Sequence, residues 1–390
     1  KRVPEKEKEM FKKAFADAYA FLQTPQSFDA FDRMHFIQQH LQPIGRQLVQ
    51  VQKKLQIPFN TIHAVRGNTA TYFDTASFNP NFFTPSNLSY LNDEKIALGK
   101  QLFNDVVLSN NNVTCASCHH IDKAFTDGLT KSQSFGADSF LPRNTPTLLY
   151  AGLQQSQFWD MRATQLEDQV KNVIDAKDEM HSSLGKAVKH IRENTSYVKM
   201  FQKAFNDGGD AVTEYKLQAA LAAYVRSLAP FTSRFDEHMR KGNVLNAEEI
   251  KGFNLFMGKG KCGSCHFVPL FNGTVPPHFT KTESEVIGVP ADATFTKIDG
   301  DSGRYNIYQI EEWKGAFKTP TLRNVSLTAP YMHNGVYKTL EEVMDFYNEG
   351  GAVGRGKDLP NQTLPPDKLN LTKKETAQII LFLQTLTDAP

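Results

Sequence analysis

The sequence predicts a mainly α-helical protein with two similar domains and a helical N-terminal extension. Three observations support this prediction. Apolar residues recur at helical spacing in several segments. Two capping boxes, at 339–342 and 372–375, each begin such a segment. The pattern Cys-x-x-Cys-His occurs twice, at 115–119 and 262–266, so the two copies lie about one domain length apart.

The repeated pattern indicates c-type haem. Cys115 and Cys118 have the spacing that forms thioethers to a porphyrin, and His119 follows directly as an axial ligand. The second copy consists of Cys262, Cys265 and His266. A zinc knuckle or a disulfide is the alternative, but zinc does not require a histidine fused to the second cysteine of both pairs. We therefore expect two covalently bound c haems in two cytochrome c-like domains.

Composition limits the cellular setting and the partners. The chain is 40% apolar and 22% charged, and no run of about 18 apolar residues is present, so we expect no integral membrane segment. A net charge of +2 gives no support for a nucleic-acid partner. Because haem is attached to protein outside the cytoplasm and the chain starts at Lys1, we expect a mature periplasmic protein that has lost a signal peptide or lipoprotein anchor.

Residues 1–91 are expected to form a helical N-terminal extension and an irregular covering segment. The apolar periodicity predicts helices from Glu5 to before Pro25, over 28–41, and from Pro43 to before Pro58. Residues 67–91 have no sustained period. The histidines of this region, expected to be structural and not iron ligands, are His35, His40 and His63.

Residues 92–242 are expected to form the first haem domain. Helices are predicted over 96–103, 166–174, 185–191 and 214–229. The polar segment 123–142 has no clear period and contains no histidine, and we expect it to be a loop on the distal side of the haem.

Residues 243–390 are expected to form the second haem domain. A helix beginning near Asn246 leads to the second motif, and the irregular stretch 267–318 wraps its haem. The two capping boxes begin the last two helices, of which the final one could also pack back on the first haem domain.

Several separated motifs carry a family resemblance. In the first half they are 98–100, 115–119, 124–128 (AFTDG), 143–148 (RNTPTL), 157–160 (QFWD), 166–167 and 179–180. In the second half they are 317–325 (FKTPTLRNV) and 329–335 (APYMHNG). Together they are similar to the bacterial di-haem cytochrome c peroxidase family, which includes the MauG enzymes. The resemblance covers about residues 92–390.

The resemblance implies that the haem at His119 reduces peroxide and that the haem at His266 passes electrons to it. Gln157 and Glu167 match the distal pair of the family, in which the amide orients the peroxide and the carboxyl group moves a proton. A carboxyl group desolvated in a haem pocket has a raised pKa, which suits a proton shuttle near neutral pH. A surface acid beside an amide is the structural alternative.

Two departures from the family pattern affect the irons. Typical members block the peroxidatic iron with a loop histidine until the other haem is reduced. Segment 128–142 contains none, so we expect an open iron in the oxidised protein without reductive activation, unless a displaced histidine such as His120 replaces it. Tyr347 stands fourteen positions after His333, where the family has methionine and the MauG branch has tyrosine. A phenolate is a hard anionic donor that lowers the reduction potential. The alternative ligands are Met344 and Met332.

The resemblance also implies a calcium ion between the haems and an aromatic bridge for electrons. The positions that match the calcium ligands are Asn144, Thr328 and Pro330. The expected bridging tryptophan is not evident when Trp159 is assigned to the distal motif, and Tyr150 takes its place in this interpretation.

The expected function is reduction of hydrogen peroxide to water by a periplasmic di-haem peroxidase, with electrons from a small cytochrome c or cupredoxin. A homodimer is compatible with this reading. One alternative is a MauG-like enzyme that oxidises residues of a partner protein through a high-valent di-haem state. A second alternative is a non-enzymatic di-haem electron carrier with two six-coordinate irons.

Overall fold

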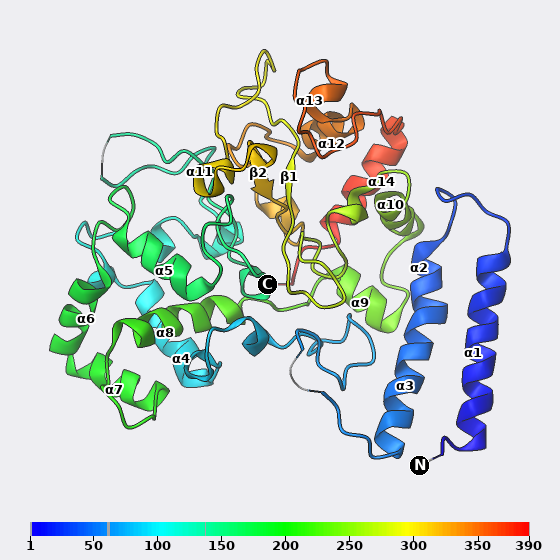
Figure 1. Cartoon of the computed structure of the whole chain (residues 1–390), viewed down its shortest axis with the longest axis horizontal. Helices are drawn as coiled ribbons and strands as arrows, with labels where there is room; N and C mark the ends of the chain where they lie inside the picture. The colour runs from blue at the N-terminus through cyan, green and yellow to red at the C-terminus, as the bar shows by residue number, and fades with distance from the viewer. Residues whose placement is uncertain (1, 61–62, 137, 390) are drawn as a thin grey trace.

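The computed structural model describes residues 2–60, 63–136 and 138–389. The described chain is mainly helical, as predicted. Figure 1 shows two groups of helices side by side, with a hairpin of N-terminal helices along the outer edge of the second group. No helix in the described ranges is both long and apolar enough to cross a membrane.

The N-terminal hairpin pairs α1 (Glu5–Gln23) with a second, longer rod. This rod is continuous through α2 (Arg33–Phe36), a π-helical turn (Ile37–Leu41) and α3 (Gln42–Lys54). The expected break before Pro43 is absent. Pro43 has no N–H to donate, and the preceding turn is wound in the wider π form, which displaces the usual bonding pattern at this point.

The first group of helices forms the first core. It consists of α4 (Asp93–Phe103), α5 (Leu166–Asp175), α6 (Leu184–Glu193), α7 (Thr195–Ala204) and α8 (Glu214–Ser227). Helix α8 is buried along most of its length, and α4 crosses it closely at Gly99. A Cβ atom at Gly99 would lie 2.0 Å from the carbonyl oxygen of Ala220, so only glycine permits this crossing.

A buried ion pair joins α5 to α8. Glu167 accepts hydrogen bonds from Nη1 and Nη2 of Arg226, each at 2.7 Å, and both side chains are almost fully buried. Arg226 Nη2 also donates to the carbonyl of Phe83 at 3.1 Å. The two-point geometry fixes the position of the guanidinium group as well as its charge.

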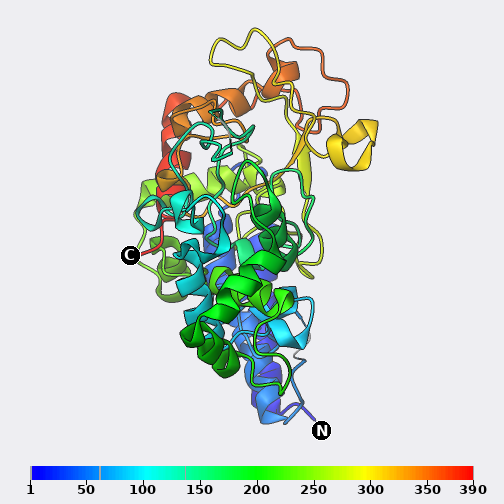
Figure 2. The ribbon, with the colours of Figure 1, turned by 90° about the vertical axis from the view of Figure 1, so that its left-hand side faces the viewer.

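The second group forms the second core. It consists of α9 (Arg234–Lys241), α10 (Ala247–Met257), α11 (Tyr305–Tyr308), α12 (Leu340–Asn348), α13 (Gly351–Gly354), α14 (Lys373–Gln384) and an antiparallel pair of strands, β1 (Ser284–Val286) and β2 (Ala316–Lys318). In Figure 2, α11, drawn in gold, projects from the upper right-hand side of the molecule.

Two details of the predicted domain organisation differ from the structure. The final helix α14 packs on α10, and a Cβ atom at Gly252 would lie 2.0 Å from the carbonyl oxygen of Gln378. The last helix therefore belongs to the second core and not to the first. Helix α9 lies before the expected boundary at residue 242, yet its Phe235 and Met239 are buried in the second core.

The predicted capping boxes at Thr339 and Thr372 are confirmed at the start of α12 and α14. The helices expected within the first domain are confirmed to within a few residues. The strands were not expected because each has only three residues and lies in the irregular stretch 267–318.

The ion pair between α5 and α8 gives a stability prediction. Replacing Glu167 by Gln leaves the buried Arg226 guanidinium without its counter-charge, and we expect a loss of about 3–5 kcal/mol in the free energy of unfolding. Guanidinium unfolding followed by circular dichroism measures it. Asp168→Asn, at the exposed next position, is the matched control and should change stability by less than about 0.5 kcal/mol. Equal stability of the two variants would contradict the assignment.

Candidate functional site

The first Cys-x-x-Cys-His motif forms a tight turn that presents its histidine to a cavity. Residues Cys115–Ser117 make a 3₁₀ turn, and the thiols of both cysteines are free. His119 Nδ1 lies 2.8 Å from the carbonyl oxygen of Phe125, which fixes the proton on Nδ1 and leaves Nε2 as a ligand atom. Burial lowers the pKa of His119, so the imidazole is in its neutral, metal-binding form.

The second motif repeats the arrangement with a different hydrogen bond. Cys262–Ser264 form the same turn. His266 Nδ1 lies between two carbonyl oxygens, 3.2 Å from that of Phe271 and 3.1 Å from that of Pro320. Burial lowers the pKa of His266 to about 4, which keeps this imidazole neutral as well.

Each motif lines a cavity whose walls suit a porphyrin. The cavity at His119 is walled mainly by apolar side chains, including Phe103, Val170 and Leu221. The cavity at His266 is larger and is walled in part by Phe256, Ile379 and Leu383. Burial raises the pKa of Cys115 and of Cys262 to about 12, so these thiols are protonated while free.

The larger cavity also has polar groups that lack partners. Lys318 Nζ is buried there, where its one hydrogen bond is to the carbonyl of Ser156 at 3.2 Å, and burial lowers its pKa to about 8 against the opposing charge of Asp160. Thr319 Oγ1 and Gln154 Oε1 are buried in the same wall without a hydrogen-bond partner. The Lys318 ammonium and the Thr319 hydroxyl are donors that fit the carboxylates of a haem, so the residues of this cavity are suited to hold a c haem.

Two polar side chains on α5 and the loop after it line the cavity at His119. They are Gln169 and Glu179. Burial raises the pKa of Glu179 to about 7, although the charge of Arg162 opposes the change. Among the residues that the structure describes, His119 is the only histidine in the cavity wall. The cavity therefore contains one amide and one carboxyl group poised near neutral pH, without a second imidazole to block the iron.

The predicted pair Gln157 and Glu167 lies elsewhere. Gln157 Nε2 donates to the carbonyl of Ala151 at 3.1 Å, and the side chain of Glu167 is held by Arg226. Neither residue is in the cavity wall. Gln169 and Glu179, twelve positions later, have the same spacing of ten residues, so the sequence contains two such Gln/Glu pairs. The family motif was matched to the first pair, whereas the second pair lines the cavity.

The candidate ligands for the second iron lie on one helix. Tyr347 and Met344 of α12 both line the cavity that contains His266, and Met332 lines it from the preceding loop. Burial raises the pKa of the Tyr347 phenol. The sequence predicts Tyr347 as the ligand and leaves Met344 as an alternative. The structure brings both side chains to the same cavity.

Trp159 and Tyr150 occupy different surroundings. Trp159 lines the larger cavity, and its Nε1 donates to the carbonyl of Asn144 at 2.9 Å. Its own carbonyl accepts from Lys318 N at 2.8 Å. Tyr150 is in the wall of neither cavity, and its hydroxyl is hydrogen-bonded to the carboxylate of Asp388.

The three positions expected at calcium all border the larger cavity. Asn144 donates from Nδ2 to the carbonyl of Leu129 at 2.7 Å, and Thr328 and Pro330 belong to a later loop. Within the described ranges no group of three Asp, Glu, His or Cys side chains could hold a metal ion. The oxygen atoms at the three positions are those of the Asn144 amide, the Thr328 hydroxyl and the backbone carbonyls.

His35, His40, His63 and His120 lie outside both cavity walls, whereas His333 lines the larger cavity. His35 and His40 stack on Phe21 of α1, with ring centroids 5.2 Å and 5.0 Å away. The backbone of His120 pairs with Thr126.

Comparisons with known proteins show the family of the chain. A family model described as di-haem cytochrome c peroxidase matches residues 93–244. The methylamine utilization protein MauG of Methylorubrum extorquens is 31% identical over 328 residues, which cover 82% of this chain and 87% of that protein. The cytochrome c551 peroxidase of Nitrosomonas europaea is 33% identical over 307 residues, which cover 76% of this chain and 80% of that protein.

Solved structures give the same result. A MauG-like protein associated with microbial copper homeostasis superimposes with a TM-score of 0.70 at 30% identity, covering 78% of this chain and 94% of that one. The diheme peroxidase BthA of Burkholderia thailandensis superimposes with a TM-score of 0.62 at 26% identity, covering 80% and 89%. The fold, the two haem-attachment motifs and these relatives together show that the chain belongs to the di-haem cytochrome c peroxidase family, which includes MauG.

Proposed function

We propose that this protein is a periplasmic peroxidase that reduces hydrogen peroxide to water at the His119 site. The observation that carries the proposal is the wall of the cavity at His119, which contains Gln169, Glu179 and, in the described part of the chain, no second histidine. A haem held at His119 would supply the electrons that cleave the O–O bond. Because no other described histidine lines this cavity, the chain offers no imidazole there that would have to be released by prior reduction of the other haem.

Glu179 and Gln169 divide the work on the substrate, in place of the pair predicted at 157 and 167. With a pKa of about 7, Glu179 can accept the proton of the near peroxide oxygen and return it to the far oxygen as water leaves. The Gln169 amide offers both a donor and an acceptor to orient the peroxide. The apolar remainder of the wall excludes water and strengthens both interactions.

The His266 site stores and passes on electrons in this proposal. Tyr347, an anionic oxygen ligand when deprotonated, favours the oxidised state of an iron there. Trp159 belongs to the first domain in sequence and lines the cavity that contains His266, whereas Tyr150 lines neither cavity, so we assign the electron bridge to Trp159 in preference to Tyr150. The proposed electron donor is a small cytochrome c or cupredoxin. The proposed calcium ligands are Asn144, Thr328 and Pro330.

Tyr347 favours a second candidate function. Its place in the His266 cavity, together with the similarity to MauG, supports an enzyme that oxidises residues of a partner protein with the same two haems. The peroxidase would oxidise a small electron-donor protein, whereas the MauG-like enzyme would oxidise side chains of its partner. A carrier function is less well supported, because it requires a strong distal ligand at His119.

The role of Glu179 gives a kinetic prediction. Glu179→Gln should slow the reaction with peroxide by about 10²–10⁴-fold. In the parent protein the rate should rise as pH increases through about 7, because the carboxylate is the base, and this inflection should be absent in the variant. Stopped-flow spectroscopy on folded, fully haem-loaded protein measures both.

Asp178→Asn is the matched control, since Asp178 is the exposed neighbour of Glu179. It should keep the rate above neutral pH and keep the inflection, displaced to lower pH, because the charge of Asp178 helps to raise the pKa of Glu179. A Glu179→Gln variant that keeps the parent rate, while a folded Glu167→Gln variant loses it, would return the catalytic role to the pair at 157 and 167.

The ligand of the second iron gives a spectroscopic prediction. Tyr347→Phe should change the low-spin EPR signal and raise the reduction potential of the His266 haem, because it removes an anionic donor. Tyr337→Phe is the control, since Tyr337 is also a buried tyrosine of the second domain but does not line the cavity. If Met344→Leu alters the signal and Tyr347→Phe does not, methionine is the ligand.

A further inference from the structure

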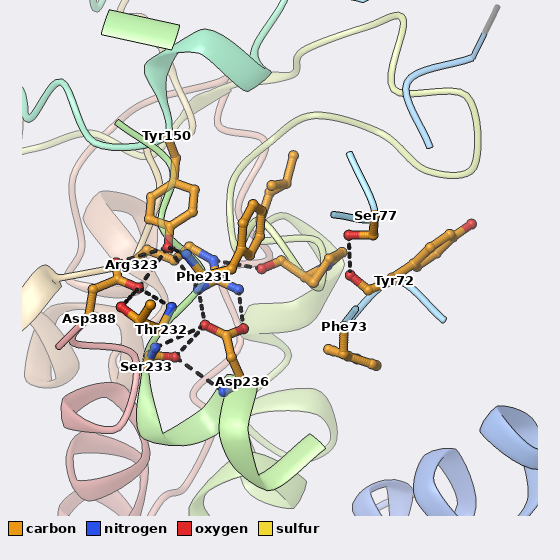
Figure 3. Close-up of polar contacts among 12 residues, drawn as sticks. Tyr72, Phe73, Ser77, Tyr150, Phe231, Thr232, Ser233, Asp236, Arg323 and Asp388 are labelled. Carbon is orange, nitrogen blue, oxygen red and sulfur yellow. Dashed lines mark hydrogen bonds and ion pairs between the residues drawn. The ribbon is translucent and has the colours of Figure 1, made fainter. Parts of the chain in front are cut away.

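A fully buried arginine lies at the junction of the two haem domains. Arg323 is 0% exposed, and its Nη1 and Nη2 atoms each donate to a different oxygen of Asp236 at 2.8 Å. Asp236 stands in the first turn of α9, where Ser233 Oγ donates to it at 2.7 Å. Figure 3 shows this pair with Tyr150 and Asp388 beside it.

The remaining donor of Arg323 reaches the loop that follows the second haem motif. Its Nε donates to the carbonyl of Pro269 at 2.9 Å. Two further bonds join the same pair of loops, from Thr321 Oγ1 to the carbonyl of Leu270 at 2.8 Å and from Leu322 N to that of Phe271 at 2.9 Å. The segments 267–271 and 320–324 are thereby fixed against each other and against α9.

Within the described part of the chain, these two loops carry both hydrogen-bond acceptors of His266 Nδ1. One is the carbonyl of Phe271 and the other that of Pro320, at 3.2 and 3.1 Å. His119 has a different arrangement, with a single shorter bond to Phe125 at 2.8 Å, and lies in a loop that Arg323 does not contact. The Nδ1 proton of His266 is shared between two carbonyl oxygens on different loops. The strength of this hydrogen bond therefore depends on the contacts that fix the distance between the two loops.

We propose that the Arg323–Asp236 ion pair is a positioning element for His266. It fixes the two carbonyl groups that accept the Nδ1 proton and so sets the donor strength of the axial imidazole and the reduction potential of the second haem. A stronger bond at Nδ1 makes the imidazole a more basic ligand and stabilises the oxidised iron. The first haem is outside this control.

Tyr150 gives the network a link to the first domain. Its hydroxyl lies 3.3 Å from Arg323 Nη1, accepts from Phe231 N at 2.9 Å and donates to Asp388. Tyr150, proposed above to give way to Trp159 as an electron bridge, thus has a role in holding the guanidinium group.

The inference rests on His266 being the proximal ligand of the second haem, and not on the peroxidase activity. It is tested by reduction potentials in the absence of peroxide, so a failure of the proposed function leaves it standing. Anaerobic spectroelectrochemical titration of the di-haem protein gives two midpoints. The one that moves in His266→Met belongs to the second haem.

Two variants loosen the loops in different ways. Arg323→Lys keeps the charge opposite Asp236 but removes the two-point fork and the bond to Pro269. Thr321→Val keeps the ion pair and removes the bond to Leu270. Arg234→Lys is the control. Arg234 is on the same helix as Asp236, but it pairs with Glu249 of α10 at 2.6 Å and its hydrogen bonds go to neither loop.

We expect Arg323→Lys to raise the midpoint of the second haem by about 59 mV or more, a tenfold change in the ferric-to-ferrous ratio. Thr321→Val should raise it by a smaller amount, and the first midpoint and the control should not move. If Arg323→Lys fails to fold, Thr321→Val decides alone. Folded variants that lose thermal stability but leave the second midpoint in place, or that shift both midpoints equally, would overturn the inference.

Discussion

Both haem sites depend on the hydrogen bond between a backbone carbonyl and Nδ1 of the proximal histidine. It fixes the tautomer and the ring plane, so that Nε2 is the atom left for iron. At His119 the acceptor comes from the turn directly after the motif, while at His266 one of the two acceptors, Pro320, lies more than fifty residues away in sequence. The first site is therefore fixed locally and the second by the tertiary structure.

This difference matches the proposed division of roles. The His119 cavity has one carboxyl group near neutrality and one amide in an apolar wall, which suits proton movement on a small substrate. The His266 cavity is lined by both Tyr347 and Lys318, which suits a redox centre whose charge is balanced by protein groups. Trp159 lies in the wall of the larger cavity and belongs to the sequence motif of the first domain.

Several features of the fold and of the sites could be predicted from the sequence. These are the haem motifs, most helices of the two haem domains and both capping boxes. Each depends on a local pattern of a few residues and not on contacts between distant segments. The Gln/Glu pair that lines the His119 cavity could not be identified in this way, because Gln157 with Glu167 and Gln169 with Glu179 have the same spacing and only the tertiary structure shows which pair faces the cavity. The partner of Glu167, Arg226, is on another helix 59 residues later, and the Arg323 network joins five distant segments.

The central claim is that the iron at His119 is open in the oxidised protein. Its most direct test is to add one equivalent of hydrogen peroxide to the fully oxidised di-haem protein and to follow optical and EPR spectra by rapid mixing. The account predicts an immediate loss of a high-spin ferric signal with no reductant present. A protein that stays unchanged until one haem is reduced, or that shows two low-spin irons indifferent to peroxide, would contradict it.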